Sequence, residues 1–392
     1  MPAVGEVGWF GRCARGGHGP TLDAMSEHFE TVIIGAGQAG LATAYHLMRE
    51  DRSFVVLESN ERVGDNWRNR FDSLKLYSPA KYDGLPGWPM PVAPWTYPTK
   101  DQLADYFEAY AERFELPVVT GVSVDSLRRE GDRYVICAGA HRFVADNVVV
   151  ASGTFQEPVV PDFAGELDPS IVQMHSRDYR NPSQLQDGQT LVVGSAHSGA
   201  DIALEVAATR PTMLSGRVHG EAPFDIEGRI ARRVLPILWF VANHVLTMRT
   251  PMGRKARHHV RASGGPLLRV KRRHLEAAGV ERVEHRVTGV VDGRPVLADG
   301  RVLHDVANVV WCTGFGKDVS WIEIPVTGED GWPEQERGVV ASSPGLYFVG
   351  LPVLFAFASM LVGGVGRDAQ FVAEHIAART RANVPEPAYA AA

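Results

Sequence analysis

The sequence predicts an α/β protein built from two Rossmann-like domains, the second inserted into the first. A glycine-rich turn between an apolar strand and a helix occurs twice, at Gly35 and at Gly194. Two similar strand-and-turn segments, VVVASGTF and VVWCTGF, stand before and after the second loop. A strand, a glycine loop and a helix in this order form a dinucleotide-binding unit. The 392 residues are enough for two such domains.

The first loop, in TVIIGAGQAGLATAYHLMRE, is a complete GxGxxG fingerprint made by Gly35, Gly37 and Gly40. The first glycine allows the tight turn, the second lets the backbone approach a pyrophosphate, and the third lets the helix pack on the strand. The next strand, SFVVLE, ends at Glu58, 23 residues after Gly35. A carboxylate at this distance is expected to accept hydrogen bonds from ribose hydroxyls.

The second loop, LVVGSAHSGADIALEV, repeats this pattern with one change. Gly194 and Gly199 keep the first and third positions, but Ala196 stands where the second glycine is expected. We predict that Gly194, Ser195, Ser198 and Gly199 bind a second dinucleotide. The alternative is a structural repeat that no longer binds one.

The strand after this second loop indicates which nicotinamide cofactor is preferred. It ends at Ser215, 21 residues after Gly194, and no acid follows until Glu221. An NAD-specific domain places Asp or Glu there, whereas Arg accommodates the 2′-phosphate of NADP. We therefore predict that Ser215 and Arg217 bind NADPH, with NADH less preferred. The alternative is that Arg217 merely faces solvent.

The two linking segments suggest domain boundaries. The first domain is predicted to comprise residues 28–157 and 309–381, and the inserted domain residues 158–308. Residues 1–27 are expected to be a disordered extension and residues 382–392 a flexible tail.

The composition narrows the class of protein. A hydrophobic content of 45%, a charged content of 22% and a net charge of −6 are typical of a globular protein and argue against general nucleic-acid binding. The three cysteines lie far apart, without a CxxC pair or metal-ligand spacing. We therefore expect a cytoplasmic protein without a metal site, and a dithiol-dependent reductase is disfavoured.

The order of the motifs resembles that of the flavin-containing monooxygenase family (class B flavoprotein monooxygenases), especially its small bacterial members and YUCCA-type plant relatives. The resemblance covers residues 28–380 and also rests on RVGDNWRNRFDSLKLYSP, MHSRDYR and GLYFVGLP…GGVGRDAQFVAEHI. The fingerprint of this family, FxGxxxHxxx followed by an aromatic residue, is altered. His175 and Tyr179 are retained, but Pro169 and Ile171 stand in place of Phe and Gly.

The resemblance implies permanently bound FAD and a visiting NADPH. NADPH would reduce FAD, O₂ would add at flavin C4a, and the (hydro)peroxyflavin would transfer one oxygen to a small hydrophobic substrate, by S- or N-oxidation or a Baeyer–Villiger reaction. His175 and Tyr179 would brace the linker between the domains, and they are the only candidates for catalytic residues. The residues expected to hold FAD are Gly35, Gly37, Gly40, Glu58, Gly64, Asn66, Trp67 and Gly350.

Other functions stay open at this stage. One is an NADPH oxidase or flavin reductase that does not oxygenate, and another is a redox accessory flavoprotein at a membrane surface. The apolar segment 234–242 is too short to span a bilayer, which takes about 20 residues. The chain then carries nine Lys and Arg and no acid between Arg249 and Leu275. Residues 230–274 therefore form a buried or interface helix, a lid over a substrate channel, or a peripheral membrane contact. The sequence also leaves open whether the chain is a homodimer.

Overall fold

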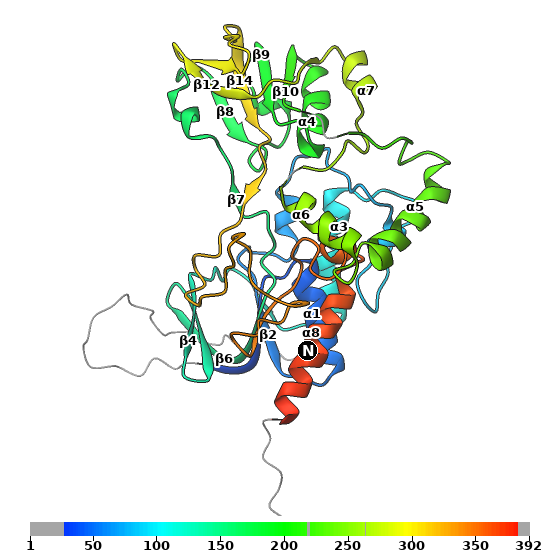
Figure 1. Ribbon diagram of the computed structural model, residues 1–392, viewed down its shortest axis with the longest axis vertical. Coiled ribbons are helices and arrows are strands. Elements are labelled where there is room, and N and C mark those ends of the chain that lie inside the picture. Colours follow the sequence, from blue (N-terminus) through cyan, green and yellow to red (C-terminus); the bar gives the residue numbers. More distant parts are fainter. Residues whose placement is uncertain (1–26, 218–219, 263, 383–392) are drawn as a thin grey trace, which may run out of the picture.

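The computed structural model describes residues 27–217, 220–262 and 264–382, so nearly all of the predicted extension 1–27 and tail 382–392 lies outside the described residues. Two sheets form two bodies, one above the other in the view of Figure 1, with β7 at the narrow passage between them.

The larger sheet carries the first glycine loop. Its strands run in the order β3-β2-β1-β6, and the long strand β6 then pairs with antiparallel β5 along its first half and with parallel β16 along its second half. Strand β4 follows β5 at the edge. The strands are β1 (Glu27–Ile34), β2 (Phe54–Leu57), β3 (Val118–Val119), β4 (Ser126–Glu130), β5 (Arg133–Ala138), β6 (His141–Val150) and β16 (Leu346–Phe348).

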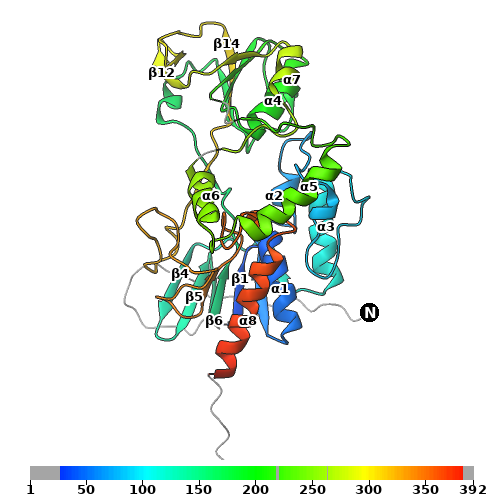
Figure 2. The same cartoon turned by 45° about the vertical axis from the view of Figure 1, so that its right-hand side comes forward.

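Three helices cover one face of this sheet: α1 (Gln38–Arg49), α3 (Lys100–Arg113) and α8 (Gly366–Ala382). Helices α1 and α8 lie side by side in both views (Figures 1 and 2). Helix α3 begins with a capping box, in which the Gln102 N–H donates to Thr99 Oγ1 (3.2 Å) and the Thr99 N–H donates to Gln102 Oε1 (3.0 Å). The described chain also contains four short 3₁₀ turns: η1 (Ala80–Tyr82), η2 (Asp162–Glu166), η3 (Pro182–Gln184) and η5 (Phe357–Met360).

The second sheet is parallel throughout, with strand order β11-β10-β9-β14-β8. Helices α4 (His197–Ala207) and α7 (Arg272–Ala277) pack near β10 and β11, and a hairpin of β12 (Val287–Val291) and β13 (Arg294–Leu297) is appended. The strands are β8 (Val172–His175), β9 (Gln189–Val193), β10 (Thr212–Ser215), β11 (Glu281–Val283) and β14 (Val306–Trp311).

The second sheet is built from residues that lie between β6 and β16 of the first sheet, but one predicted boundary is wrong. Strand β14 pairs with β8 and β9, so it belongs to the second sheet as far as Trp311. The boundary placed at residue 309 therefore cuts through a strand, and the chain returns to the first domain only after Trp311. The two segments that connect the domains pair with each other as the short antiparallel strands β7 (Glu157–Pro158) and β15 (Phe315–Gly316).

A helical excursion leaves the second domain and packs against the first. It consists of α5 (Ala231–Phe240), the π-helical turn η4 (Val241–Val245) and α6 (Pro251–Ala262). The Met248 N–H donates to Phe355 O (2.7 Å), and the Phe357 N–H donates to Leu246 O (2.9 Å). The Trp239 ring stacks on Tyr82 at 4.7 Å between centroids. This excursion thus lies beside the first domain, near α3 and α8 (Figure 2).

Candidate dinucleotide sites

The two glycine loops have the same backbone geometry. Gly35 and Gly194 adopt φ angles of +104° and +107°, which favour glycine. A Cβ atom would lie 2.7 Å from Ala151 O at Gly35 and 2.2 Å from Cys312 O at Gly194. Each first glycine is therefore required both by its conformation and by the strand end that packs against it.

The third glycine of each loop is required by close packing. A Cβ atom on Gly40 would lie 1.8 Å from Gly35 O, and one on Gly199 would lie 1.7 Å from Gly194 O. These distances are far below any normal contact, so the helix can approach its loop only without a side chain at this position.

The second position is where the two loops differ in sequence but not in conformation. Gly37 has φ −78° and ψ −172°, and Ala196 has φ −84° and ψ −164°. Neither pair of angles requires glycine, so Ala196 does not distort the second loop. A Cβ atom on Gly37 would meet nothing within 4 Å, which leaves this backbone open to a pyrophosphate.

The second loop is more enclosed than the first. A Cβ atom on Gly264 would lie 2.9 Å from the Ala196 methyl group, and His197 Nε2 is 2.5 Å from Pro266 O. Residues 264–266 therefore cover part of the second loop, and a nucleotide that binds this loop must also contact them.

Both loops lead into helices whose first N–H groups are available. The N-cap residues Gly37 of α1 and Ala196 of α4 make no side-chain capping bond, and neither helix has an acid in its first turn. Helix α3, in contrast, is capped by Thr99. Uncapped N–H groups at the positive end of a helix dipole fit the phosphates of a dinucleotide.

Glu58 lies beside the first loop, immediately after β2. Its side chain is buried, and its Oε2 accepts the Ala36 N–H (2.8 Å). Its Oε1 accepts the main-chain N–H (3.0 Å) and Nδ2 (2.5 Å) of Asn60. These bonds fix the carboxylate next to the loop, and its remaining lone pairs can accept ribose hydroxyls.

The other residues predicted to contact FAD have mixed placements. A Cβ atom on Gly350 would lie 2.8 Å from Ala39 Cβ, so Gly350 lies over the first turn of α1. Trp67, on α2 (Asp65–Arg68), has a buried Nε1 without a hydrogen-bond partner in the described residues. This orphaned donor fits a cofactor oxygen. Gly64 instead packs on α3, where a Cβ atom would lie 2.5 Å from Ala104 O, and Asn66 is exposed.

Polar residues of the second loop also divide into two groups. The Ser195 hydroxyl is buried without a partner in the described residues, and Ser198 is exposed in the first turn of α4. Both are available to a cofactor. Ser215, however, is fully buried and donates its hydroxyl to His285 O (2.8 Å). Its predicted contact with the 2′-phosphate is therefore wrong, because the hydroxyl is buried and bonded at the end of β10. The predicted preference for NADPH then rests on Arg217, which is exposed.

His175 lies at the linker between the domains. Its Nδ1 accepts the Arg177 N–H (3.1 Å), so its Nε2 carries the proton and donates to Gly314 O (3.0 Å). The ring also packs edge-on against Phe315 at 5.0 Å between centroids. Burial lowers the pKa of His175, which keeps the ring neutral in this bracing position.

Tyr179 does not brace the linker as predicted. It is fully buried, and its hydroxyl donates to Glu205 Oε2 (2.9 Å) on α4. Burial raises its pKa. The two catalytic candidates thus have structural partners, and the side chains hold the second domain and its linker in place.

Sequence reasoning missed a polar network that joins the domains. Tyr77 donates its hydroxyl to Asp201 Oδ2 (2.7 Å) on α4. The Arg269 guanidinium lies over the Tyr77 ring at 5.1 Å and donates to Lys75 O (3.1 Å). Tyr77 and Lys75 belong to the KLYSP stretch, and the place of this stretch in the order of motifs was the only sequence feature that pointed to the network. This network ties the first domain to the helix that follows the second loop.

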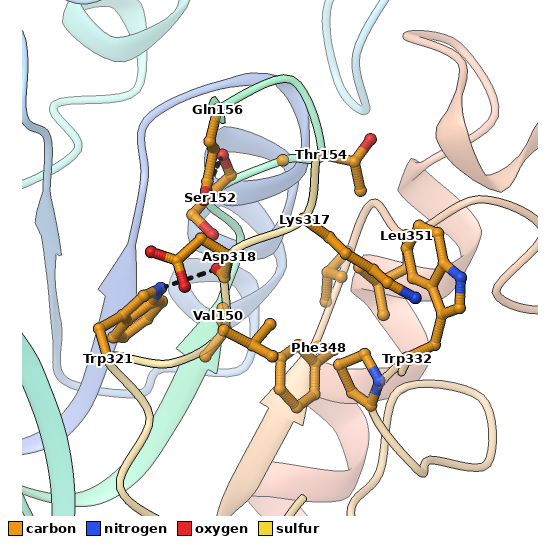
Figure 3. A pocket seen from close by; sticks show the side chains of 14 residues that line it. Val150, Ser152, Thr154, Gln156, Lys317, Asp318, Trp321, Trp332, Phe348 and Leu351 are labelled. Carbon is orange, nitrogen blue, oxygen red and sulfur yellow. Dashed lines mark hydrogen bonds between the residues drawn. The ribbon is translucent and has the colours of Figure 1, made fainter. Parts of the chain in front are cut away.

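A small cavity lies at the carboxyl ends of β6 and β16 (Figure 3). Its volume is about 20 Å³, and Ser152, Lys317 and Trp332 are among its lining residues. Trp321 Nε1 donates to Asp318 O (3.2 Å) at its edge. The space fits roughly one water molecule, so it is too small for a nucleotide or an organic substrate.

The family model of pyridine nucleotide-disulphide oxidoreductases matches residues 32–245, more than half of the chain. The chain belongs to this family. The match includes both glycine loops and the segment that connects the domains between them. The two sheets, the first mixed and the second parallel, confirm the predicted α/β fold.

Individual relatives refine this assignment. An uncharacterized CzcO-like oxidoreductase of Geobacillus kaustophilus is 38% identical over 90% of this chain and 99% of its own. The probable indole-3-pyruvate monooxygenase YUCCA3 of Arabidopsis thaliana is 29% identical over 89% of this chain and 86% of its own. The solved flavin-containing monooxygenase of Stenotrophomonas maltophilia superimposes with a TM-score of 0.67 at 24% identity, over 90% of this chain and 99% of that one.

These matches confirm the predicted resemblance to flavin-containing monooxygenases. They also show that the chain is an enzyme, a flavin-dependent oxidoreductase.

Proposed function

We propose that the protein is an NADPH-dependent FAD monooxygenase that transfers one oxygen atom of O₂ to a small organic substrate. The observation that carries this proposal is the pair of glycine loops with matching backbone geometry, each leading into an uncapped helix. The similarity to YUCCA-type and bacterial flavin monooxygenases supports oxygenation in particular.

FAD fits the first loop. The open backbone at Gly37 would face the pyrophosphate, and Glu58 would accept the ribose hydroxyls. The unpartnered Trp67 Nε1 and the strand end at Gly350 would contact the flavin half. When bound, FAD accepts hydride and activates O₂, which is chemistry that no side chain supplies.

NADPH fits the second loop. Its pyrophosphate would lie at the start of α4, where the Ser195 hydroxyl and the exposed Ser198 are available. The Arg217 guanidinium would bind the 2′-phosphate through charge-assisted hydrogen bonds. The task of this chain is then to hold the nicotinamide against the flavin and to exclude water while oxygen is transferred.

The test uses the purified flavin-containing protein with NADPH, O₂ and a panel of sulfides, amines and ketones. The proposal predicts an oxygenated product whose formation requires NADPH and whose added oxygen comes from ¹⁸O₂. NADPH consumption that yields only hydrogen peroxide with every substrate would favour the alternative, an NADPH oxidase or flavin reductase.

A second candidate function is supported by the surface of the helical excursion. Ile230, Ile237, Leu238 and Phe240 on or beside α5, and Met252 on α6, are 46–65% exposed. No acidic residue lies between Glu227 and Glu276. Exposed apolar side chains within a basic segment fit the surface of an anionic membrane. In the described part of the chain, no helix is long and apolar enough to cross a bilayer. We therefore propose that contact through residues 230–274 would be peripheral.

Liposome co-sedimentation tests this second candidate. The protein should sediment with vesicles that contain phosphatidylserine and less with neutral vesicles, and Phe240→Ser should weaken the association. Phe155→Ser is a matched control, since Phe155 is 68% exposed outside the excursion. Equal binding of both variants, or no sedimentation of the parent protein, would rule this function out.

A further inference from the structure

Three arginines converge on one aromatic ring away from both glycine loops. The guanidinium carbons of Arg337, Arg367 and Arg249 lie 4.6, 4.8 and 5.4 Å from the centroid of Phe355. They come from three separate segments: a turn before β16, the first turn of α8, and the turn between η4 and α6. Together with Asn243, His244 and Thr247, these residues line a cavity of about 330 Å³.

The arginines of this cavity lack carboxylate partners within ion-pair distance in the part of the chain that the structure describes. Arg249, Arg337 and Arg367 form no ion pair with a carboxylate in the described residues, whereas Arg62 and Arg68 both pair with Glu108. Asp368 follows Arg367 but is fully buried, and burial raises its pKa against the opposing effect of Arg367 and Arg337. Three like charges around one ring, with no ion-paired carboxylate in the described residues, favour an anionic ligand.

Several guanidinium N–H groups also lack acceptors. In the described residues, Arg337 Nε and Arg367 Nε and Nη2 are buried without a hydrogen-bond partner. Arg367 Nη1 donates to Asn243 O (2.9 Å), which fixes one edge of that guanidinium. Buried donors normally have partners, so unpaired ones beside a cavity indicate where a ligand would supply them.

The backbone holds Arg337 in an unfavourable conformation. Glu336 and Val339 exchange two main-chain hydrogen bonds of 3.0 Å across the turn, in which Arg337 has φ +51° and Gly338 φ +91°. Such a turn favours Asn-Gly, so the backbone conformation gives no reason for an arginine at position 337. The contacts of the side chain give one, because the Arg337 guanidinium lies 4.6 Å from the centroid of the Phe355 ring and 4.0 Å from that of the Phe371 ring.

We propose that this cavity binds the carboxylate group of a small organic acid. Guanidinium groups bind carboxylates through paired, charge-assisted hydrogen bonds, and the partly exposed Phe355 ring offers an apolar contact for the rest of the ligand. The volume of about 330 Å³ lies at the lower end of the range for small-molecule pockets, roughly 300–1,000 Å³, so a small organic acid fits. A phosphate group shares this chemistry and is distinguished by the experiment.

Calorimetric titration of the flavin-containing protein with sodium benzoate tests the proposal without turnover. Benzamide is the uncharged control ligand, and inorganic phosphate is the competing anion. Arg249→Gln removes an exposed arginine of the cavity, and Arg254→Gln removes a nearby exposed arginine that does not line it. Benzoate should bind and benzamide should not. Arg249→Gln should raise the Kd for benzoate about ten-fold, and Arg254→Gln should change it less than about two-fold, since only the first removes a hydrogen bond to a charge.

A second cavity variant guards against misfolding. Arg337→Asn keeps a residue that tolerates the left-handed conformation, so it should retain flavin and melt like the parent while losing benzoate binding. Equal losses of affinity in Arg249→Gln and Arg254→Gln would overturn the proposal, because they would show a general charge effect. Binding of phosphate without benzoate, or of neither, would also overturn it.

Discussion

Gly37 and Gly40 lie three residues apart in the first loop, yet their substitution should have opposite consequences. A Cβ atom on Gly37 would meet nothing within 4 Å, and its φ of −78° suits any residue. A Cβ atom on Gly40 would lie 1.8 Å from Gly35 O, whereas real Cβ atoms essentially never approach closer than 3.0 Å. We expect Gly37→Val to abolish FAD binding in a folded protein and Gly40→Ala to destabilise the fold itself.

The expected magnitude for Gly40→Ala follows from these distances. The helix must move by about 1.2 Å to restore a 3.0 Å contact, which opens the packing of α1 on the sheet. Overpacking of this kind costs about 1–3 kcal/mol, and a shifted backbone places the value at the upper end. A loss of about 3 kcal/mol lowers the Tm by roughly 6–12 °C in a domain of this size. Gly37→Val should stay within about 0.5 kcal/mol of the parent, because its side chain meets no protein atom.

The assay separates folding from cofactor binding. Flavin absorbance per mole of purified protein reports occupancy, and thermal unfolding of the flavin-stripped forms reports stability without the contribution of bound ligand. Gly37→Val should be colourless and melt with the stripped parent, and Gly40→Ala should melt well below it. Full flavin occupancy in Gly37→Val, or an unchanged Tm in Gly40→Ala, would refute the assigned roles.

Three further outcomes are expected. Arg217→Ala should weaken NADPH binding roughly ten- to a hundred-fold, because a hydrogen bond to a charged group contributes about 1.5–3 kcal/mol, and should leave NADH nearly unaffected. Flavin-reduction kinetics with both cofactors measure this, and equal losses would mean that Arg217 is structural. Part of the NADPH consumed should yield hydrogen peroxide, because Pro169 and Ile171 alter the fingerprint and loosely held NADP⁺ admits water. A peroxide yield near zero with a good substrate would contradict this expectation. Burial raises the pKa of Asp83 to about 7, so the native state keeps this proton longer than the unfolded chain, and stability should fall as pH rises from about 4 to about 7. In thermal unfolding, Asp83→Asn should remove much of this loss of stability between about pH 4 and pH 7. Parallel curves for parent and variant would show that Asp83 is not its source.

The sequence specified the elements that depend on local rules. The glycine positions and the insertion of one domain into another follow from local steric requirements and from strand patterns that repeat. The structure adds that Ala196 adopts the same backbone angles as Gly37, which no sequence pattern could decide.

The remaining features depend on contacts between distant segments. The Ser215 hydroxyl donates a hydrogen bond to His285 O, 70 residues away, and the Tyr179 hydroxyl donates one to Glu205 on α4. Neither side chain therefore has the role that its motif predicted. Arg249, Arg337 and Arg367 meet at Phe355 only because the excursion after α5 folds back onto the first domain. Such meetings are set by tertiary packing, and a single sequence carries no periodic signal for them.

Under the proposed function, the first loop holds FAD and the second loop holds NADPH, which donates the hydride. The most direct test is an anaerobic titration of the purified protein with NADPH, followed by the absorbance of oxidised flavin. We expect a yellow protein whose flavin is fully bleached by about one equivalent of NADPH, since one hydride reduces one flavin. We also expect NADH to reduce the flavin more slowly. A protein that binds no flavin, or a bound flavin that stays oxidised with both nicotinamide cofactors, would contradict the proposed function.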